Sequence, residues 1–260
     1  MTLAMACAIF CDCPGHHASL DEKGNTVPEM DEHGSYGQFC PVAMAAEILC
    51  NRWTALIIRE LLAGSTRFND LRRGVPRMSP SLLSKRLKEL EEAGVIVAEP
   101  TRQAGVVDYK LTAAGEDLRG IIDSIGFWGQ RWIESSLTLK NLDPALLMWD
   151  IRRNLRPGPL PQRRCTIKFT YPELAPDQRS WWLVVESTTV DLCLSDPGYE
   201  VDVYVRAALR TMTSIWMGLS NLTSEIEAGH IEIDGDKAIS RSIQAWLGLS
   251  TFAKGERRAG

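Results

Sequence analysis

One sixteen-residue stretch, from Ser79 to Gly94, constrains the fold of this 260-residue chain more than any other segment. Ser79 suits an N-cap, Pro80 suits the first helical position, and Gly94 suits the residue that follows a helix. Leucines at i, i+4 and i+7 form one apolar stripe: Leu83, Leu87 and Leu90. A turn of about 100° per residue places polar side chains on the other face: Ser81, Ser84, Lys85, Lys88 and Glu92. The segment predicts an amphipathic helix whose outer face is basic over its first two turns.

The segments around this helix predict a specific order of elements. Three helices are expected before it, over residues 42–50, 53–62 and 67–72, with a break at 74–76. Two strands are expected after it, over residues 95–97 and 107–111, as a hairpin. Thr112 then caps a long helix that continues to Ser135. Helices followed by a hairpin and a further helix are the order of a winged helix-turn-helix.

The formal net charge of −4 hides a local basic cluster. Residues 1–40 hold six acids and one base, whereas the stretch from Arg52 to Arg102 holds ten bases and six acids. A nucleic-acid-binding face needs such a local excess of Lys and Arg, which the charge of the whole chain does not reveal.

Several motifs follow one another in this region: Cys40-Pro41, Arg52-Trp53, Leu61-Leu62, Arg67-Phe68-Asn69-Asp70-Leu71, the stretch Ser79–Gly94, and the segment Val107–Gly115. In this order, residues 39–135 resemble the HxlR family of bacterial transcription regulators. Met78 stands before Ser79 where the family often has Ile. The resemblance implies a winged helix domain that binds double-stranded DNA, as a homodimer on a pseudo-palindromic operator.

The predicted DNA contacts lie on the amphipathic helix, at its cap, on the wing and at the preceding helix. A helix that enters the major groove must present hydrogen-bond donors there. We expect contacts from Ser79, Ser81, Ser84, Lys85, Arg86, Lys88, Arg102, Arg67 and Asn69. Arg86 lies near the packed edge, so it either reaches a phosphate or pairs with an acid. The alternative is an ordinary amphipathic surface helix, which the turn and the wing disfavour.

A continuous apolar stripe marks the long helix that begins at Thr112. Its members advance by four, three and four residues: Ile121, Ile125, Trp128 and Trp132. The resemblance implies that this helix and the first helix form a dimer interface. Packing of the same stripe against the C-terminal domain is the alternative.

The C-terminal part has a strand-rich half followed by helix, helix, strand and helix. The segments VDVYVRAALRTMTSIWMG (201–218) and AGHIEIDGDKAISRSIQAWL (228–247) resemble the end of a sterol-carrier-protein-like domain. The resemblance implies an α/β domain in which helices cover a sheet around an apolar cavity. Large, soft apolar side chains suit a ligand pocket, so we expect Trp182, Met212 and Trp216 to bind the ligand. The alternative is that all three are plain core residues.

The chain is therefore expected to have an α+β fold with four segments: a tail (1–38), a winged helix domain (39–137), a sterol-carrier-like ligand-sensing domain (138–252) and a short tail (253–260). We expect a cytoplasmic transcription regulator modulated by an apolar small molecule. We expect no enzyme activity and no cofactor, because the sequence shows no set of acid–base or nucleophilic residues. We expect no membrane-spanning helix, because no apolar run reaches about 18 residues. Two alternatives remain: a redox- or electrophile-sensing regulator, and a lipid-binding protein whose winged helix contacts proteins.

The seven cysteines do not form a disulfide or metal pattern. Cys7, Cys11 and Cys13, with His16 and His17, lack the paired spacing of a zinc site, so no metal is predicted. Cys40 stands directly before a helix, a position where thiols become reactive, and some HxlR members sense oxidants or electrophiles with a cysteine there. Cys40 is thus the redox candidate, and Cys50 is expected to be buried.

Overall fold

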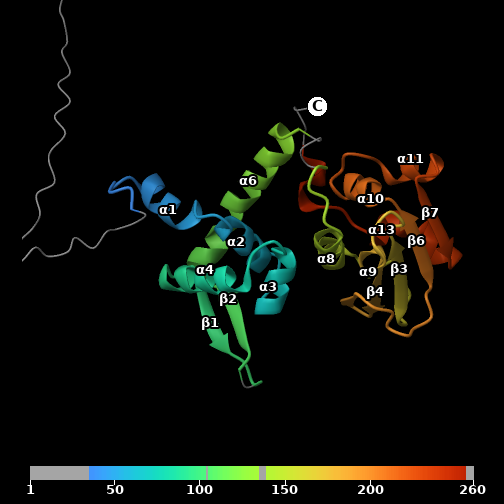
Figure 1. Ribbon diagram of the computed structural model, residues 1–260, viewed down its shortest axis with the longest axis horizontal. Helices are drawn as coiled ribbons and strands as arrows, with labels where there is room; N and C mark the ends of the chain where they lie inside the picture. The colour runs from blue at the N-terminus through green and yellow to red at the C-terminus, as the bar shows by residue number, and fades with distance from the viewer. Residues whose placement is uncertain (1–34, 104, 135–138, 256–260) are drawn as a thin grey trace, which may run out of the picture. The chain divides into compact units, whose positions relative to one another are not determined.

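The computed structural model describes residues 35–103, 105–134 and 139–255 (Figure 1). The chain divides into two compact units, Met1–Glu47 and Ile48–Gly260. In the first unit, the Ser35 hydroxyl and the Tyr36 N–H donate to the Glu47 carboxylate at 2.9 and 2.6 Å. Helix α1 (Pro41–Leu49), which begins in this unit, contains no buried residue.

The second unit begins with a winged helix. Three helices, α2 (Thr54–Leu62), α3 (Phe68–Gly74) and α4 (Pro80–Glu92), precede a two-stranded antiparallel hairpin of β1 (Ile96–Pro100) and β2 (Val107–Leu111). Their apolar stripes meet in one cluster, the N-terminal core: Ile57, Ile58, Leu61, Leu71, Val75, Met78, Leu83, Leu87, Leu90, Val95, Ile96 and Ile122. The three leucines of the predicted helix stripe are all in this core, so the hydrophobic periodicity correctly predicted the buried side of α4.

The helix expected from Thr112 to Ser135 is two helices, α5 (Ala113–Asp117) and α6 (Arg119–Trp132). The Thr112 hydroxyl caps α5, accepting from the Gly115 N–H at 3.3 Å. At Leu118 the backbone makes shorter-range bonds: its N–H donates to the Gly115 carbonyl, and its carbonyl accepts from Ile121. This turn of 3₁₀ type redirects the chain without interrupting the apolar pattern, so the sequence did not reveal it.

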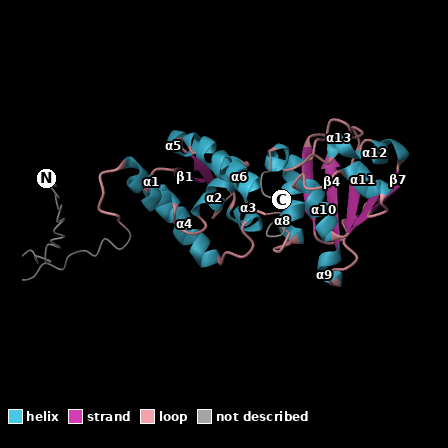
Figure 2. Cartoon of the chain, turned by 90° about the horizontal axis from the view of Figure 1, so that it is seen from above, coloured by secondary structure: helices cyan, strands magenta, loops and turns pink. Residues whose placement is uncertain are grey.

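The rest of the second unit is built on a five-stranded sheet in the order β5-β4-β3-β6-β7 (strands in magenta, Figure 2). The strands are β3 (Cys165–Thr170), β4 (Ser180–Glu186), β5 (Thr189–Cys193), β6 (Val203–Ala207) and β7 (Ile231–Gly235). Only β3 and β6 pair in parallel; the other neighbours are antiparallel. The strand-rich half expected from the sequence is therefore present.

The helices of this part are α8 (Pro144–Asn154), α9 (Pro176–Arg179), α10 (Leu209–Trp216), α11 (Leu222–Glu227), α12 (Lys237–Arg241) and α13 (Ile243–Trp246), followed by the 3₁₀ helix η1 (Thr251–Lys254). The last of the helices expected in this part is thus divided at Ser242 into α12 and α13, and α9 was not predicted. Side chains from one face of the sheet and from α8, α10, α12 and α13 form a second cluster, the C-terminal core. In β6 the alternation is clean, with Val203 and Val205 buried and Tyr204 and Arg206 exposed.

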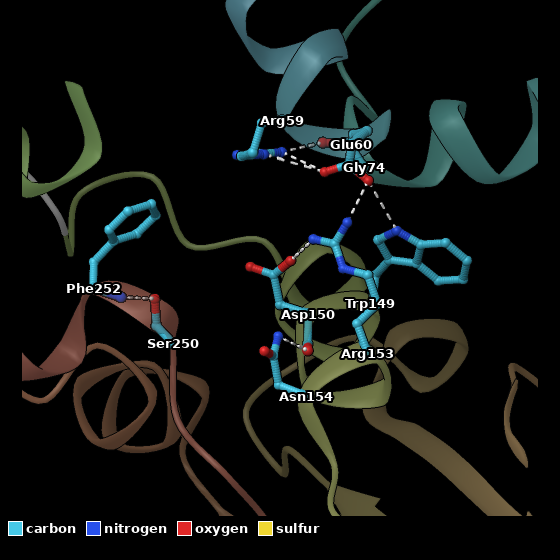
Figure 3. A network of polar contacts seen from close by, with 9 residues as sticks. All are labelled: Arg59, Glu60, Gly74, Trp149, Asp150, Arg153, Asn154, Ser250 and Phe252. Carbon is cyan, nitrogen blue, oxygen red and sulfur yellow. Dashed lines mark hydrogen bonds and ion pairs between the residues drawn. The ribbon is translucent and has the colours of Figure 1, made fainter. Parts of the chain in front are cut away.

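A buried ion-pair network joins α2 to α8 within this unit (Figure 3). The Glu60 side chain is fully buried, and its Oε2 accepts from Arg153 Nη1 at 2.6 Å and from Trp149 Nε1 at 3.2 Å. Its Oε1 accepts from Arg59 Nη2 at 2.8 Å. Arg153 also pairs with Asp150. Because a buried carboxylate is tolerable only when it is paired and hydrogen-bonded, Glu60 ties the two cores together.

Helix α6 makes a second junction with the C-terminal elements. The Gln130 amide is buried and donates to the Met217 carbonyl at 3.0 Å. The rings of Phe127 and Phe252 meet edge to face, with centroids 5.3 Å apart. Gly126 lies against the same Phe252 ring, where a Cβ atom would come within 2.3 Å of it.

The predicted domain boundary at residue 137 and part of the predicted terminal tails lie outside the described residues. Within the part of the chain that the structure covers, no single helix is long and apolar enough to cross a membrane. Helices α1 and α2 reach that length and composition only when taken together as a broken pair.

Candidate nucleic-acid interface

The start of α4 is fixed by its own sequence. Ser79 has an extended backbone, and its Oγ accepts from the Leu82 N–H at 3.3 Å. Pro80 occupies the first helical position, where the lack of an N–H is no loss. The Ser79 and Ser81 hydroxyls lie 3.2 Å apart. Both serines are exposed, so the capped end of the helix presents two hydroxyls and the unsatisfied backbone N–H groups of its first turn.

The outward face of α4 is polar and accessible. Ser84, Lys85 and Lys88 are exposed, and the two lysine side chains are 70% and 77% exposed. Lys85 lies 3.9 Å from Glu89, and Lys88 lies 3.5 Å from Glu92. Exposed pairs of this spacing contribute only about 0.3–0.5 kcal/mol, so both ammonium groups can exchange a carboxylate for a phosphate or a base edge at little cost.

Arg86 lies at the edge of the buried stripe. Its side chain is only 18% exposed and pairs with Glu89. Its Nε is buried without a hydrogen-bond partner. Of the two roles expected for Arg86, the structure shows the pairing with an acid.

One predicted basic contact lies at the tip of the wing, and another contacts the wing from the start of α3. Arg102 is exposed in the connection between β1 and β2. Arg67 precedes α3, and its Nε lies 3.5 Å from the Asp108 carboxylate on β2. The Thr66 hydroxyl donates to the same carboxylate at 3.3 Å, and the Thr66 carbonyl accepts from the Tyr109 N–H. Arg67 therefore ties α3 to the wing and still has half of its side chain exposed.

Asn69 lies on a different side from the outward face of α4. It lines a cavity together with residues of α8, β4 and β5. Conversely, sequence reasoning missed Arg77, which is exposed in the turn between α3 and α4, two residues before the cap Ser79. The signal was available, because a base just before the N-terminus of a predicted recognition helix lies where a phosphate would dock.

The apolar stripe of α6 stays largely accessible in the described part of the chain. Its members are largely exposed, by 46, 55, 61 and 48% in chain order: Ile121, Ile125, Trp128 and Trp132. The neighbouring Ile122 faces the N-terminal core, and Gln130 faces the C-terminal elements. Among the described residues, the contacts of α6 with the C-terminal elements come from other positions, Phe127 and Gln130, so the alternative that the stripe packs against the C-terminal domain stays a prediction.

The three expected ligand-binding residues do not meet in one place. Met212 and Trp216 are buried in the C-terminal core. Trp182 lies on the other face of β4, where Lys168 approaches its ring at 5.0 Å. The indole N–H groups of Trp182 and Trp216 are both buried without a hydrogen-bond partner. None of the three lines a cavity found in the described part of the chain, and their ligand-binding role stays a prediction.

The cysteines differ in accessibility. Cys40 is half-buried just before α1, Cys165 is buried, and Cys193 is half-buried. Cys50 is exposed, so the expectation that it packs in the core was wrong; it directly follows α1, a helix without buried residues. Cys7, Cys11, Cys13, His16 and His17 lie outside the described residues. Among the residues the structure covers, no group of three His, Cys, Asp or Glu side chains could hold a metal ion.

Known proteins resemble the region that contains this interface. The model of the HxlR-like helix-turn-helix family matches residues 48–137. The uncharacterized HTH-type transcriptional regulator YvaP of Bacillus subtilis is 40% identical over 101 residues, which are 38% of this chain and 94% of YvaP. The HTH-type transcriptional regulator YodB of the same organism is 31% identical over 102 residues, 38% of this chain and 91% of YodB. A solved structure of reduced YodB covers 37% of this chain and 97% of that chain, with 31% identity and a TM-score of 0.33.

The relatives at this level of identity are HTH-type transcriptional regulators, and the chain spans nearly the whole length of YvaP. The matched region contains α2 to α6 and the hairpin, which are the elements that place the basic face of α4 outward. By sequence and by the order of its elements, the chain belongs to the HxlR-like helix-turn-helix family of transcription regulators.

Proposed function

We propose that this protein is a sequence-specific DNA-binding transcription regulator that inserts α4 into the major groove. The observation that carries the proposal is the outward face of α4, where Ser81, Ser84, Lys85 and Lys88 stand together above a fully buried leucine stripe. Lysine and serine donors on one helix face suit the acceptors of base edges and phosphates. In this arrangement the DNA backbone is contacted on either side of α4 by Ser79, Arg67 and Arg102. Because the DNA is the binding partner, the proposed location of the protein is the cytoplasm.

We propose further that the protein acts as a homodimer on a pseudo-palindromic operator. A single winged helix reads one half-site, and two copies related by a twofold axis read two. The exposed stripe of α6 is the surface that a second copy would cover, because large apolar side chains gathered on one helix face favour burial. Helix α1, which has no buried residue and exposes Val42 and Met44, would join it.

The test is binding to the DNA upstream of the gene, measured by fluorescence anisotropy at several salt concentrations. If several phosphates are contacted, affinity falls steeply with salt, with a slope of about −0.9 per phosphate. Lys85→Ala combined with Lys88→Ala should weaken specific binding by about 10-fold or more and lower the slope by about 2.

The matched control is Lys237→Ala combined with Lys254→Ala, which removes two exposed lysines of the C-terminal part. It has the same change in net charge and should bind DNA as the unaltered chain does. Equal losses in both double variants would show that only overall charge matters, and unchanged binding in the α4 variant would refute the assignment of α4 as the recognition helix.

The C-terminal part is proposed to be a sterol-carrier-like domain that modulates DNA binding by holding an apolar small molecule. Its five-stranded sheet, one face of which packs with helices into a large apolar core, supports this proposal. An effector changes DNA affinity only if it binds the two conformational states with different affinity. Footprinting with and without added lipid extract tests the modulation, and identical footprints at all extract concentrations would contradict it.

A second candidate function is redox or electrophile sensing through Cys40. The favouring observation is that this thiol is partly accessible and stands directly before α1, a helix proposed to lie in the dimer interface. A solved relative, YodB, has been determined in a quinone-bound form. If oxidant lowers the DNA affinity of the unaltered chain and not that of Cys40→Ser, the sensing role holds; an identical response of both refutes it.

A further inference from the structure

We propose that the chain binds an amphipathic organic anion, one with an aromatic or alkyl body and a single acidic headgroup, in a cavity between α3 and the C-terminal elements. The cavity holds about 390 Å³. This volume lies within the range of natural small-molecule sites. The inference rests on the proposed function for its regulatory consequence, and it gives the effector a site and a chemical class.

One wall of the cavity is apolar. Trp149 of α8, Trp181 of β4, and Leu192 and Leu194 at β5 line it. Trp181 satisfies its own indole N–H through the Gln178 carbonyl at 2.7 Å, so its ring offers only apolar surface to a ligand. Leu194 is 65% exposed, which is costly for so large an apolar side chain unless something covers it. This wall suits a flat aromatic ring or an alkyl chain.

Another part of the lining is cationic. Arg72 and Arg73, in the last turn of α3, line it together with the amide of Asn69, and no acidic residue of the described ranges lines the cavity. Arg73 pairs with Asp70 at 3.1 Å. Arg72 is exposed and has no ion-pair partner among the described residues. A guanidinium next to an apolar wall is suited to a carboxylate or sulfonate group, because the fork of donors matches two acceptor oxygens.

The cavity is connected to the junction that holds the two cores together. Trp149, whose ring lines the cavity, donates through its Nε1 to the buried Glu60 of α2. The guanidinium carbons of Arg73 and Arg152 lie 5.2 and 4.7 Å from the centre of the same ring. A ligand that moves Arg73 or Trp149 would therefore change the contacts of these residues with α2 and with the end of α3. The end of α3 is followed by the turn that leads to Ser79, the cap of α4.

This site differs from the residues that sequence reasoning selected. Trp182, Met212 and Trp216 do not line it, whereas Arg72, Arg73 and Trp149 do. Arg72 and Arg73 lie in the winged helix, and Trp149 lies in the C-terminal part. A sequence motif of either part alone therefore could not have identified this cavity.

The test uses the full chain and two fluorescent probes that differ by one charged group. The probes are 8-anilinonaphthalene-1-sulfonate and its neutral counterpart N-phenyl-1-naphthylamine. The sulfonate should bind saturably, at one molecule per chain. Arg72→Ala should weaken its binding by about 10-fold or more, as expected when a charge-assisted hydrogen bond is lost, and should leave the neutral probe unaffected. Leu194→Asp, at an exposed position where folding is not at risk, should weaken both probes.

Two control variants make the outcome decisive. Arg210→Ala removes an exposed arginine of α10 that is away from the cavity, and it should bind both probes normally. Unchanged binding of the sulfonate to Arg72→Ala and Leu194→Asp would overturn the site. So would loss of binding in Trp128→Ser alone, which would place the probe on the α6 stripe.

The regulatory step is read separately from the binding step. DNA affinity of the ligand-free chain tests the proposed function; its absence would refute DNA binding while leaving the fluorescence result intact. With DNA binding established, saturating sulfonate probe should shift the DNA affinity of the unaltered chain by about 3-fold or more and should not shift that of Arg72→Ala. No shift in the unaltered chain at saturation would overturn the effector role of the cavity.

Discussion

Gly74 lies against the Glu60 side chain, and a side chain at position 74 would collide with the Glu60 carboxylate. A Cβ atom added at Gly74 would lie 1.8 Å from Glu60 Cδ and 1.9 Å from Oε2. The Gly74 carbonyl also accepts from Arg59 Nη2 at 3.0 Å. At the scale of single residues, then, the end of α3 is shaped around a buried carboxylate. The glycine is required here for space, since its φ is not positive.

Gly74→Ala should destabilise the chain by about 2–4 kcal/mol, because the collision displaces a fully buried carboxylate that accepts four hydrogen bonds. Gly120→Ala is the matched control: it lies in α6, and no atom comes within 4 Å of its added Cβ. That change should stabilise by about 0.5–1 kcal/mol through helix propensity. Urea unfolding measures both, and similar stabilities of the two variants would contradict the role given to Gly74.

The thiols should differ sharply in reactivity. Burial, with the carboxylate of Asp202 acting in the same direction, raises the pKa of Cys165 to about 12. At pH 8 only about one Cys165 side chain in 10⁴ is then a thiolate, and the thiolate is the form that reacts. Iodoacetamide labelling followed by mass spectrometry should modify the exposed Cys50 first and Cys165 only after unfolding. Rapid labelling of Cys165 in the native chain would disprove this order.

At the scale of elements, local sequence signals predicted most of the helices and strands that the structure contains. Ser79, Pro80 and Gly94 delimited α4 because capping and helix termination act within one turn of the chain. The strand-rich half was predicted from segments that alternate or run apolar. Strand β6 alternates, whereas β3 and β4 are buried along most of their length. The breaks at Leu118 and Ser242 were missed because both lie inside continuous apolar patterns and depend on where the neighbouring elements sit.

The α2–α8 junction should behave as one coupled unit. Glu60→Gln keeps the shape of the side chain but leaves Arg59 and Arg153 without their buried anion, so it should cost about 3–5 kcal/mol of stability. Arg153→Met should cost a similar amount. The double variant should cost less than the two together by about 1–3 kcal/mol, because the second change removes a partner that is already lost.

The control is the exposed pair of α4. Lys85→Ala should change stability by less than about 0.5 kcal/mol, since its distance to Glu89 is 3.9 Å and both side chains are in water. All variants can be measured by urea unfolding under one set of conditions. Strict additivity of Glu60→Gln and Arg153→Met would show that the contact does not couple α2 to α8.

At the scale of the whole molecule, DNA recognition is proposed to need two chains. Trp128→Ser combined with Trp132→Ser should shift the protein from dimer toward the 29.0 kDa monomer, because the apolar area that drives association is removed from an exposed surface. DNA affinity should fall with it. Sedimentation velocity measures the shift, and Ile226→Ser, an exposed apolar position on α11, is the control. A monomeric unaltered chain, or a dimeric double variant, would refute the interface.

The sequence by itself determined the winged helix, its family and the basic outer face of α4. These follow from local capping, from 3.6-residue periodicity and from motifs that stand within about a hundred residues. Only the tertiary structure decided what those signals leave open. It brought Glu60 to Arg153 and Trp149, left the α6 stripe largely exposed, and brought Arg72 and Trp181 into the lining of one cavity. The physical reason is that such contacts join residues about 90 or more positions apart, and their energies depend on burial and geometry that no local pattern contains.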